Sequence, residues 1–511
     1  MQLRELLNAI SPVAVEGSTA VDICALECDS RQVKPGALFF ALPGSKTDGR
    51  KYISQALAAG AIGVVADSFA GPEQAEGCCF IQVANVRRAM AQAAAHYYGN
   101  PGKGIPVIGV TGTNGKTTIT YLIEAILKSA GYTPAVFGTV DYRLADTLRF
   151  EATHTTPESL DLMRMLAEFR RHGANALVME VSSHALEQHR ADGLDFDIAV
   201  FTNLTQDHLD YHAGLEPYFA SKRRLFTELL GNGVALINAD DPYGRRLLTD
   251  IPAARTFGRR SSCTLYPRQV TIGREGIHGV FSGSHGEVQI DSPMIGEFNL
   301  SNLLAAVAVA QQLNISNEQI AAGIRVAPQV PGRLERVDND GEVLALVDYA
   351  HTGDALEQVL KTLFNLEHQR LYTVVGCGGD RDPGKRPLMA AAAVNYSDLA
   401  IFTSDNPRTE DPLAILDQIR SGALAAGGCE LDPGTVAGDS RGFVVIPDRR
   451  SAINYAVDLA GKGDLLLVAG KGHEDYQILG TTKIHFDDRE ELQRALAQAC
   501  AAPIPGGRAH V

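Results

Sequence analysis

The strongest chemical signal in the sequence is a glycine-rich stretch after a short apolar run. Residues 107–110 are apolar, and residues 111–118 read Thr-Gly-Thr-Asn-Gly-Lys-Thr-Thr. Glycines let backbone N–H groups approach an anion, and a helix beginning near Thr117 would point its positive end at the same place. We predict a phosphate-binding loop in which Lys116 holds the terminal phosphates and Thr117 a magnesium ion. The general motif has glycine where this chain has Val110, so a strand-to-helix turn that binds nothing is the alternative.

Two further apolar runs end in residues that suit a phosphate site. Residues 176–179 lead into Glu180, and residues 198–201 lead into a polar stretch that contains His208. Parallel strands deliver their carboxyl ends to one edge of a sheet, so we expect both side chains near Lys116. We predict that they complete a magnesium or water-ordering shell around the γ-phosphate of ATP. The alternatives are that Glu180 caps a helix and that His208 is an ordinary polar loop residue.

An alternation of strands and helices must position these residues. From Gly109 onward, apolar runs alternate with helical stretches, which is typical of a parallel sheet with crossover helices. Thr156 and Pro157 have the chemistry of a helix start, and Asn302 stands as a possible cap before an alanine-rich helix at residues 303–313. In the last third, four apolar runs again end in polar residues, as expected of a second ligand-binding domain.

Linker-like segments divide the chain of 511 residues into three predicted domains. Residues 99–104 are rich in glycine, and Pro331 with Gly332 marks a second boundary. We predict an α/β protein with three parts. They are a small N-terminal α/β domain at residues 1–100, a central P-loop ATPase-type domain with a parallel sheet at residues 101–331, and a C-terminal Rossmann-like domain at residues 332–511.

The composition argues against several classes of protein. The net charge of −14, from 46 basic and 60 acidic residues, does not suit a nucleic-acid-binding surface. The eight cysteines show no paired CxxC spacing, which favours reduced thiols over a zinc or redox site. The N-terminus carries charges where a signal peptide has an apolar core, and no apolar run reaches the roughly 18 residues of a membrane span. We therefore expect a cytoplasmic protein with neither membrane nor nucleic-acid partners.

Five short motifs occur in a fixed order along the chain. They are TGTNGKTT at residues 111–118, EVSSH at 180–184, DYAHT at 348–352, DNPR at 405–408 and KGHE at 471–474. In this order they resemble the Mur ligases, and the resemblance runs from about residue 30 to residue 474. It implies a monomeric ligase that uses ATP and magnesium to add an amino acid to UDP-N-acetylmuramoyl-L-alanyl-D-glutamate. Such a ligase makes peptidoglycan precursor, and so serves cell-wall biogenesis, cell shape and cell division.

The resemblance assigns roles to individual positions. The ATP-binding positions are Gly112, Thr113, Asn114, Gly115, Lys116, Thr117, Thr118, Asn302, Arg333 and Asp348. The catalytic positions are Lys116, Glu180, His208 and Lys222, and the metal positions are Thr117, Glu180, His208 and Lys222. The positions for the UDP-linked substrate are Ser30, Thr155, Thr156, Ser182, Gln188 and Arg190. Lys222 lies in a basic run that by itself indicates a solvated helix face. The family carbamylates the matching lysine, and a carbamate is an anionic magnesium ligand.

The resemblance also implies an amino-acid pocket in the last third of the chain. Its positions are Arg381, Asp405, Asn406, Pro407, Arg408, Gly470 and Glu474. Diaminopimelate differs from lysine by one distal carboxylate, which Arg408 can hold bidentately, so the pocket favours meso-diaminopimelate. The implied reaction passes through an acyl phosphate and ends in an amide. Two positions depart from the family pattern: Gly353 replaces an expected proline and should loosen a loop, and His154 leaves one substrate contact open.

Two other classes of function compete with this interpretation. One is a related amide ligase that uses lysine or another amino acid, including a protein similar to folylpolyglutamate synthetase. The other is a nucleotide-dependent switch or binding module without ligase activity. The amino-acid pocket argues against the switch, which would not need it, and Arg408 distinguishes between the ligases.

Overall fold

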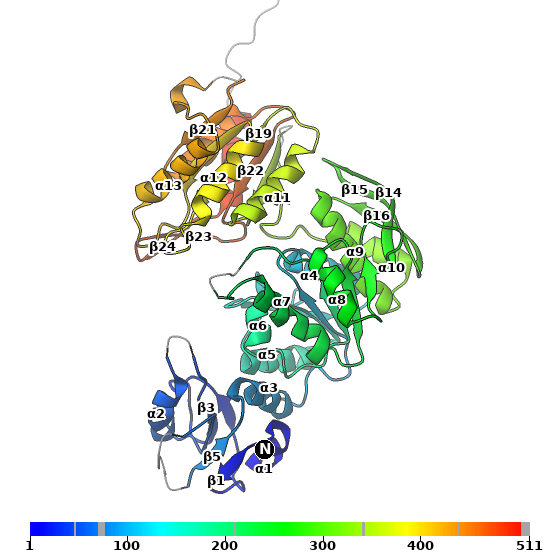
Figure 1. Ribbon diagram of the computed structural model, residues 1–511, viewed down its shortest axis with the longest axis vertical. Coiled ribbons are helices and arrows are strands. Elements are labelled where there is room, and N and C mark those ends of the chain that lie inside the picture. Colours follow the sequence, from blue (N-terminus) through cyan, green and yellow to red (C-terminus); the bar gives the residue numbers. More distant parts are fainter. Residues whose placement is uncertain (45–46, 70–76, 208–210, 340–342, 437–438, 502–511) are drawn as a thin grey trace, which may run out of the picture. The chain divides into compact units, whose positions relative to one another are not determined.

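The computed structural model describes residues 1–44, 47–69, 77–207, 211–339, 343–436 and 439–501. The chain divides into two compact units, whose helices and strands are labelled in Figure 1. The first unit comprises Met1–Arg268, Phe281–Gln289 and Ser301–Val326, and the second comprises Gln269–Val280, Ile290–Leu300 and Ala327–Val511. Within the described part of the chain, no helix has both the length and the apolar character needed to cross a bilayer.

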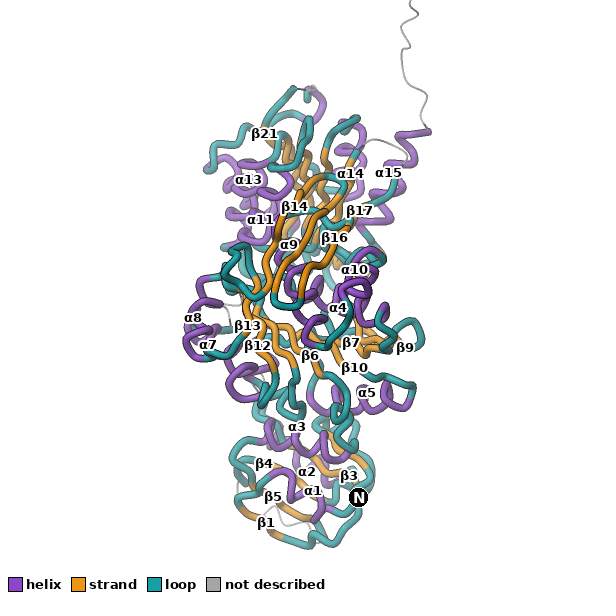
Figure 2. The backbone as a smooth tube through the Cα atoms, turned by 90° about the vertical axis from the view of Figure 1, so that its right-hand side faces the viewer, coloured by secondary structure: helices purple, strands orange, loops and turns teal. Residues whose placement is uncertain are grey.

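A five-stranded sheet forms near the N-terminus, in the order β1-β5-β4-β3-β2. Its strands are β1 (Ala14–Glu16), β2 (Ala25–Glu27), β3 (Ala37–Phe40), β4 (Gly63–Ala66) and β5 (Cys79–Gln82). Its helices are α1 (Leu3–Ile10), η1 (Gly49–Tyr52), α2 (Ile53–Ala58) and α3 (Val86–Tyr97). Apolar residues of α1 and α3 pack with Leu38 and Phe40 on one face, and those of α2 pack with Phe39 on the other. Helices therefore cover both faces. Figure 2 shows the course of the backbone through these helices and strands.

The second sheet follows the predicted alternation of strands and helices. Its order is β9-β8-β7-β10-β6-β11-β12-β13, continuing to β14, β15 and β16. The strands are β6 (Val107–Thr111), β7 (Pro134–Phe137), β8 (Asp141–Leu144), β9 (Leu148–Glu151), β10 (Ala176–Glu180), β11 (Ile198–Phe201), β12 (Val234–Asn238), β13 (Arg255–Phe257), β14 (Leu265–Gly273), β15 (Gly276–Gly283) and β16 (Gly286–Ser292). The helices are α4 (Lys116–Ser129), α5 (Ser159–Arg171), α6 (Ser183–Glu187), α7 (Leu215–Arg224), the π-helix η2 (Leu225–Leu229), α8 (Pro242–Asp250), α9 (Glu297–Gln312) and α10 (Asn317–Arg325). The central strands β6, β10 and β11 are parallel and buried at every position, which is typical of a sheet covered on both faces.

The second unit contains a six-stranded sheet in the order β17-β18-β22-β19-β20-β21. Its strands are β17 (Glu335–Arg336), β18 (Leu344–Asp348), β19 (Leu371–Cys377), β20 (Leu399–Ser404), β21 (Gly442–Val445) and β22 (Leu465–Ala469), followed by the hairpin β23 (Tyr476–Leu479) and β24 (Thr482–His485). Its helices are α11 (Gly353–Phe364), α12 (Lys385–Tyr396), α13 (Pro412–Ala425), η3 (Pro433–Thr435), α14 (Arg449–Leu459) and α15 (Asp488–Ala501). One core joins α11, α12 and α13 to the sheet, and another joins α14 and α15. The sheet is thus doubly wound.

Three local predictions from the sequence are wrong. The helix α5 begins at Ser159 rather than at Pro157, because the Thr156 hydroxyl donates to the carbonyl of Glu180 (2.8 Å) instead of capping. The helix α9 begins at Glu297, so Asn302 lies inside it rather than at its N-terminus. Gly353 does not loosen a loop. It starts α11, and a Cβ there would lie 2.7 Å from the Cβ of Leu388, so the glycine makes room for that side chain.

Candidate active site

The loop between β6 and α4 has the geometry of an anion-binding loop. Gly112 (φ 147°) and Gly115 (φ 90°) have backbone conformations that residues with a Cβ rarely adopt. A Cβ at Gly115 would also overlap Oδ1 of Asn302, which brings that predicted ATP-binding residue to the loop. Lys116 begins α4, and its Nζ donates to the carbonyl oxygens of Gly112 (2.9 Å) and Thr113 (2.7 Å). The positive end of α4 and the ammonium of Lys116 thus meet at one loop.

The end of β11 fixes the shape of this loop. The carbonyl oxygen of Asn203 accepts from Thr113 N, and its Oδ1 accepts from Asn114 N, both at 2.9 Å. The buried Thr202 hydroxyl donates to the carbonyl of Asn114 at 2.7 Å, and it occupies the space that a Cβ at Gly112 would need. Thr202 and Asn203 belong to none of the five motifs, and their signal in the sequence is a position directly after a strand that pairs with β6.

Lys222 is buried at the end of α7 and reaches the same loop. Its Nζ donates to the carbonyl oxygen of Gly112 (2.8 Å) and lies 4.4 Å from the ring centre of Tyr218. Burial, and after it the charge of Lys116, holds the pKa of Lys222 well below its usual value. The hydroxyls of Tyr218 and Thr113 lie 3.2 Å apart, which ties α7 to the loop. The solvated-face interpretation is therefore wrong for Lys222, although Arg223 next to it is exposed.

Glu180 ends β10, one strand away from the loop. It pairs in register with Val110, and its side chain is almost fully buried. Its Oε1 accepts from Thr139 N (2.9 Å) and its Oε2 accepts from the Thr139 hydroxyl (3.0 Å), so the carboxylate is fixed in orientation. Thr117 is also buried, in the first turn of α4. His208 lies outside the described residues.

Several of the predicted UDP-substrate residues form one hydrogen-bonded group. The Thr156 hydroxyl accepts from Ser182 N (3.1 Å), and the Thr156 carbonyl accepts from Nη1 of Arg190 (3.0 Å). Arg190 also donates to Oε1 of Gln188 (2.8 Å) and forms an ion pair with Glu158 (2.9 Å). The segment between β9 and α5 and the residues that flank α6 therefore bring four predicted positions into contact.

The other predicted substrate positions lie around this group or in the N-terminal sheet region. The hydroxyl of Thr155 lies 3.1 Å from that of Thr139, next to Glu180. Burial, and after it the charge of Arg190, lowers the pKa of His154. The hydroxyl of Ser30 donates to Gln55 Oε1 (3.0 Å).

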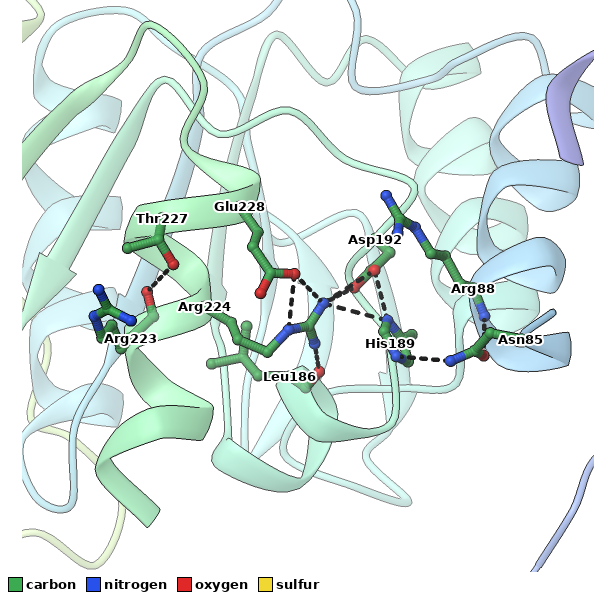
Figure 3. A network of polar contacts seen from close by, with 9 residues as sticks. All are labelled: Asn85, Arg88, Leu186, His189, Asp192, Arg223, Arg224, Thr227 and Glu228. Carbon is green, nitrogen blue, oxygen red and sulfur yellow. Dashed lines mark hydrogen bonds and ion pairs between the residues drawn. The ribbon is translucent and has the colours of Figure 1, made fainter. Parts of the chain in front are cut away.

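His189 lies between the predicted substrate residues Gln188 and Arg190, and its own backbone has a left-handed conformation. Its φ is 56°, and its Nδ1 lies 2.7 Å from Asp192 Oδ2 and 3.2 Å from a guanidinium nitrogen of Arg224 (Figure 3). Its Nε2 lies 3.0 Å from the side chain of Asn85, the residue that caps α3. This network links α3, the segment after α6, and α7 across the substrate group.

The second unit contains a cluster of charged groups at the ends of β20 and β22. The fully buried Lys471 Nζ lies 3.5 Å from Asp405, 3.4 Å from Asn406 and 3.5 Å from Glu474. Asn406 also donates to Glu474 Oε2 (2.9 Å) and accepts from Ile478 N (2.9 Å). Burial, and after it the charge of Asp405, raises the pKa of Glu474. Lys471 was quoted in a motif but not selected as a site residue, and its complete burial could not be inferred from the sequence.

Arg408 lies at the edge of this cluster in a left-handed backbone conformation, with φ 53°. Its Nη1 donates to the carbonyl of Gly379 (2.8 Å), and its backbone N–H donates to the carbonyl of Ile478 (3.1 Å). Arg381 is exposed and donates to the carbonyl of Asp380 (3.3 Å). Gly470 has φ 114°, and a Cβ there would lie 3.2 Å from Asp405. The predicted pocket residues thus come from three strand ends.

Asp348 ends β18 and organises the segment before β17. Its two carboxylate oxygens accept from Leu334 N and Ala350 N, each at 2.7 Å. Burial raises the pKa of Asp348, while the charge of Arg333 lowers it less strongly. The guanidinium of Arg333 lies 4.9 Å from the ring centre of Tyr349. Two predicted nucleotide-binding residues therefore lie close together in the second unit.

Comparison with known proteins identifies the class to which this fold and site belong. Residues 22–98 match the model of the Mur ligase family, catalytic domain, residues 110–310 match the Mur ligase middle domain, and residues 332–472 match the Mur ligase, glutamate ligase domain. The chain belongs to the Mur ligase family and has its three-domain α/β architecture. The exact limits 1–100, 101–331 and 332–511 remain our proposed boundaries.

Several similar proteins carry one name. A protein of Geobacter metallireducens called UDP-N-acetylmuramoyl-L-alanyl-D-glutamate–2,6-diaminopimelate ligase is 51% identical, with 98% of this chain and 99% of that protein aligned. A protein of the same name from Geobacter sulfurreducens is 49% identical, with 96% and 98% aligned. A solved structure of such a ligase has 34% identity and a TM-score of 0.72, and the alignment covers 98% of this chain and 100% of that one.

Proposed function

We propose that this chain is an ATP-dependent ligase that joins meso-2,6-diaminopimelate to UDP-N-acetylmuramoyl-L-alanyl-D-glutamate. The observation that carries the proposal is the convergence of Lys116 and Lys222 on one carbonyl oxygen of the phosphate loop. The ligase named above aligns with 98% of this chain at 51% identity, which supports this assignment of substrate and amino acid. The fold alone would not support this assignment, because related folds host different chemistry.

Lys222 has the properties of a lysine that reacts with carbon dioxide. Its depressed pKa favours the neutral amine, and only a neutral amine is nucleophilic. Attack of Nζ on carbon dioxide forms an N–C bond, releases one proton and gives a carbamate anion. We propose that this modification converts the Lys222 amine into a carboxylate-like ligand beside the loop.

The donor set at the loop fits a magnesium ion. Glu180 offers a buried carboxylate whose orientation is fixed by Thr139, and Thr117 offers a hydroxyl at the start of α4. We propose that these two residues and the carbamate of Lys222 hold the ion, together with His208 from the sequence prediction. When bound, magnesium neutralises charge on the phosphate oxygens during phosphoryl transfer.

The side chains of the loop supply the remaining requirements of the first step. The side-chain carboxylate of the D-glutamyl residue attacks the γ-phosphorus of ATP, which gives an acyl phosphate and ADP. Lys116 and the N-terminus of α4 stabilise the negative charge on the transferring group. Thr156, Ser182 and Arg190 are the proposed residues that orient the carboxylate.

The charged cluster of the second unit fits the second reactant. Diaminopimelate carries two ammonium groups and two carboxylates, and the cluster offers the carboxylates of Asp405 and Glu474 with the guanidinium of Arg408. In the second step, the amine of diaminopimelate attacks the acyl carbon. The C–O bond to phosphate breaks, the amine loses a proton, and an amide and inorganic phosphate are formed.

An isotope experiment tests this route. The UDP-linked substrate is labelled with ¹⁸O in the D-glutamyl side-chain carboxylate and incubated with ATP, magnesium and diaminopimelate. The acyl-phosphate route transfers one labelled oxygen from each amide formed into inorganic phosphate, which mass spectrometry detects. Amide formation with all of the label retained in the UDP product or lost to water would contradict it.

We also propose a cytoplasmic monomer, and light scattering on the purified protein tests the monomeric state.

A further inference from the structure

A fully buried ion pair lies beneath the charged cluster of the second unit. Arg449 begins α14 and Asp488 begins α15, and both side chains have 0% exposure. Nε and Nη2 of Arg449 donate to the two carboxylate oxygens of Asp488, each at 2.7 Å. Apolar residues of similar volume often stabilise a fold as well as a buried ion pair does. Stability alone therefore does not account for the pair.

Arg449 makes a third hydrogen bond that leads to the amino-acid pocket. Its Nη2 donates to the carbonyl oxygen of Ala469 at 2.9 Å. Ala469 is the last residue of β22, and the chain continues into Gly470, whose N–H donates to the carbonyl of Asp348 (3.0 Å). Two hydrogen bonds thus fix the point where the segment 470–474 leaves the sheet. One comes from Arg449 to Ala469, and the other joins Gly470 to Asp348.

Arg449 also provides positive charge beneath two pocket carboxylates. Burial lowers its pKa, but the charges of Asp488, Asp405 and Glu474 outweigh burial and raise the pKa overall. The groups that face Glu474 from the surrounding elements are Asp405, Asn406, Lys471, Arg449, Tyr349 and Tyr476. Among these, Lys471 and Arg449 are the cations, and their charges favour the ionised form of Glu474.

We infer that Arg449 is a positioning residue for the amino-acid pocket, which acts through the Ala469 carbonyl and through the carboxylates of Asp405 and Glu474, while Asp488 fixes its orientation. This inference rests on the proposed function, because it takes the pocket to bind the ammonium groups of diaminopimelate. Arg449 itself touches no substrate in this account.

The test replaces the ion pair by apolar side chains in Arg449→Met with Asp488→Leu. We expect the KM for diaminopimelate to rise about tenfold or more, with kcat and the KM for ATP within about threefold of wild type. The loss of kcat/KM on acidification should begin at higher pH than in wild type, because Arg449 is the member of the pair whose charge interacts with Glu474, and that positive charge is lost. A purely structural role would lower the unfolding temperature without moving this pH profile.

A neighbouring ion pair provides the matched control. Arg450 and Glu491 join the same two helices, at 2.7 Å, but Arg450 is 54% exposed and its described hydrogen bonds go only to Glu491. The variant Arg450→Met with Glu491→Leu should leave the KM for diaminopimelate and the pH profile unchanged. Equal changes in both double variants would overturn the inference, as would an unchanged KM and pH profile in the Arg449 variant.

A conservative variant keeps the inference testable if the double variant does not fold. In Arg449→Lys the positive charge stays, but the planar group that reaches both Asp488 and Ala469 is lost. We expect a wild-type pH profile with a raised KM for diaminopimelate, and a wild-type KM would overturn the inference. Turnover of diaminopimelate by the wild-type protein is measured first. Its absence would contradict the proposed function, whereas the variants test the role of Arg449 only after wild-type turnover is seen.

Discussion

The backbone at Gly112 determines whether the phosphate loop can keep its shape. In Gly112→Ala, a residue with a Cβ must adopt φ 147°, and strain of this kind costs about 1–2 kcal/mol. The added Cβ overlaps the Thr202 hydroxyl, which must turn away and lose its bond to Asn114, worth about 1 kcal/mol. The loop can relax in the free protein but must regain its shape to bind ATP. We therefore expect ATP binding to weaken by about 2–3 kcal/mol, or about 30- to 150-fold.

Titration calorimetry with ATP and magnesium measures this change, and two variants act as controls. Gly131→Ala introduces a residue at φ 85° where a Cβ meets nothing within 4 Å, so ATP affinity should stay within about twofold of wild type while stability falls slightly. Thr202→Ala removes the hydrogen bond alone and should weaken ATP binding about fivefold. A Gly112→Ala protein that binds ATP as tightly as wild type would refute the assignment of this loop as the nucleotide site.

Three further substitutions test other parts of the account. Glu180→Gln should lower kcat about 100-fold or more, because a carboxylate is lost near the transferring phosphate. The fold should persist, because the amide can still form hydrogen bonds with Thr139. Measurements of kcat and of the unfolding temperature test both expectations. Arg408→Lys should lower kcat/KM for diaminopimelate about 100-fold while leaving the Kd for ATP within about twofold, since the bidentate grip is lost; an equal loss for both ligands would contradict the pocket. Lys222→Met should abolish turnover and remove the carbamate ¹³C resonance expected of the wild-type protein in ¹³C-bicarbonate; a wild-type spectrum without that resonance would show that the lysine stays unmodified.

Local patterns in the sequence were sufficient to predict the glycine-rich loop between β6 and α4 and the place of Glu180. The apolar runs, the glycines and the parallel alternation together require that Glu180 and Lys116 lie at the same sheet edge, and the pairing of Glu180 with Val110 agrees. The fold class followed from the same alternation. These features depend on neighbours in the chain and on a general rule for strand ends.

The burial of Lys222 could not be predicted from its basic neighbours. It follows Tyr218 by one helical turn, so both share the face of α7 that packs against the loop, but only the tertiary structure shows that this face is buried. The contacts of Thr139 with Glu180 depend in the same way on residues that are distant in sequence.

Helix starts and buried ion pairs are two further features that the sequence alone could not predict here. Thr156 has the chemistry of a cap, but a competing bond to the Glu180 carbonyl takes its hydroxyl, and this competition has no local signature. Arg449 and Asp488 are 39 residues apart, and no periodicity links them. Residues that position a site through distant contacts therefore require the structure.

The most direct test of the central claim is phosphate release from ATP by the purified protein. Three parallel reactions contain UDP-N-acetylmuramoyl-L-alanyl-D-glutamate and magnesium, with meso-diaminopimelate, with lysine, or with no amino acid. The account predicts sustained release, matched by amide product, with diaminopimelate alone. Equal turnover with lysine would contradict the role of Arg408, and the absence of turnover with either amino acid would contradict the ligase itself.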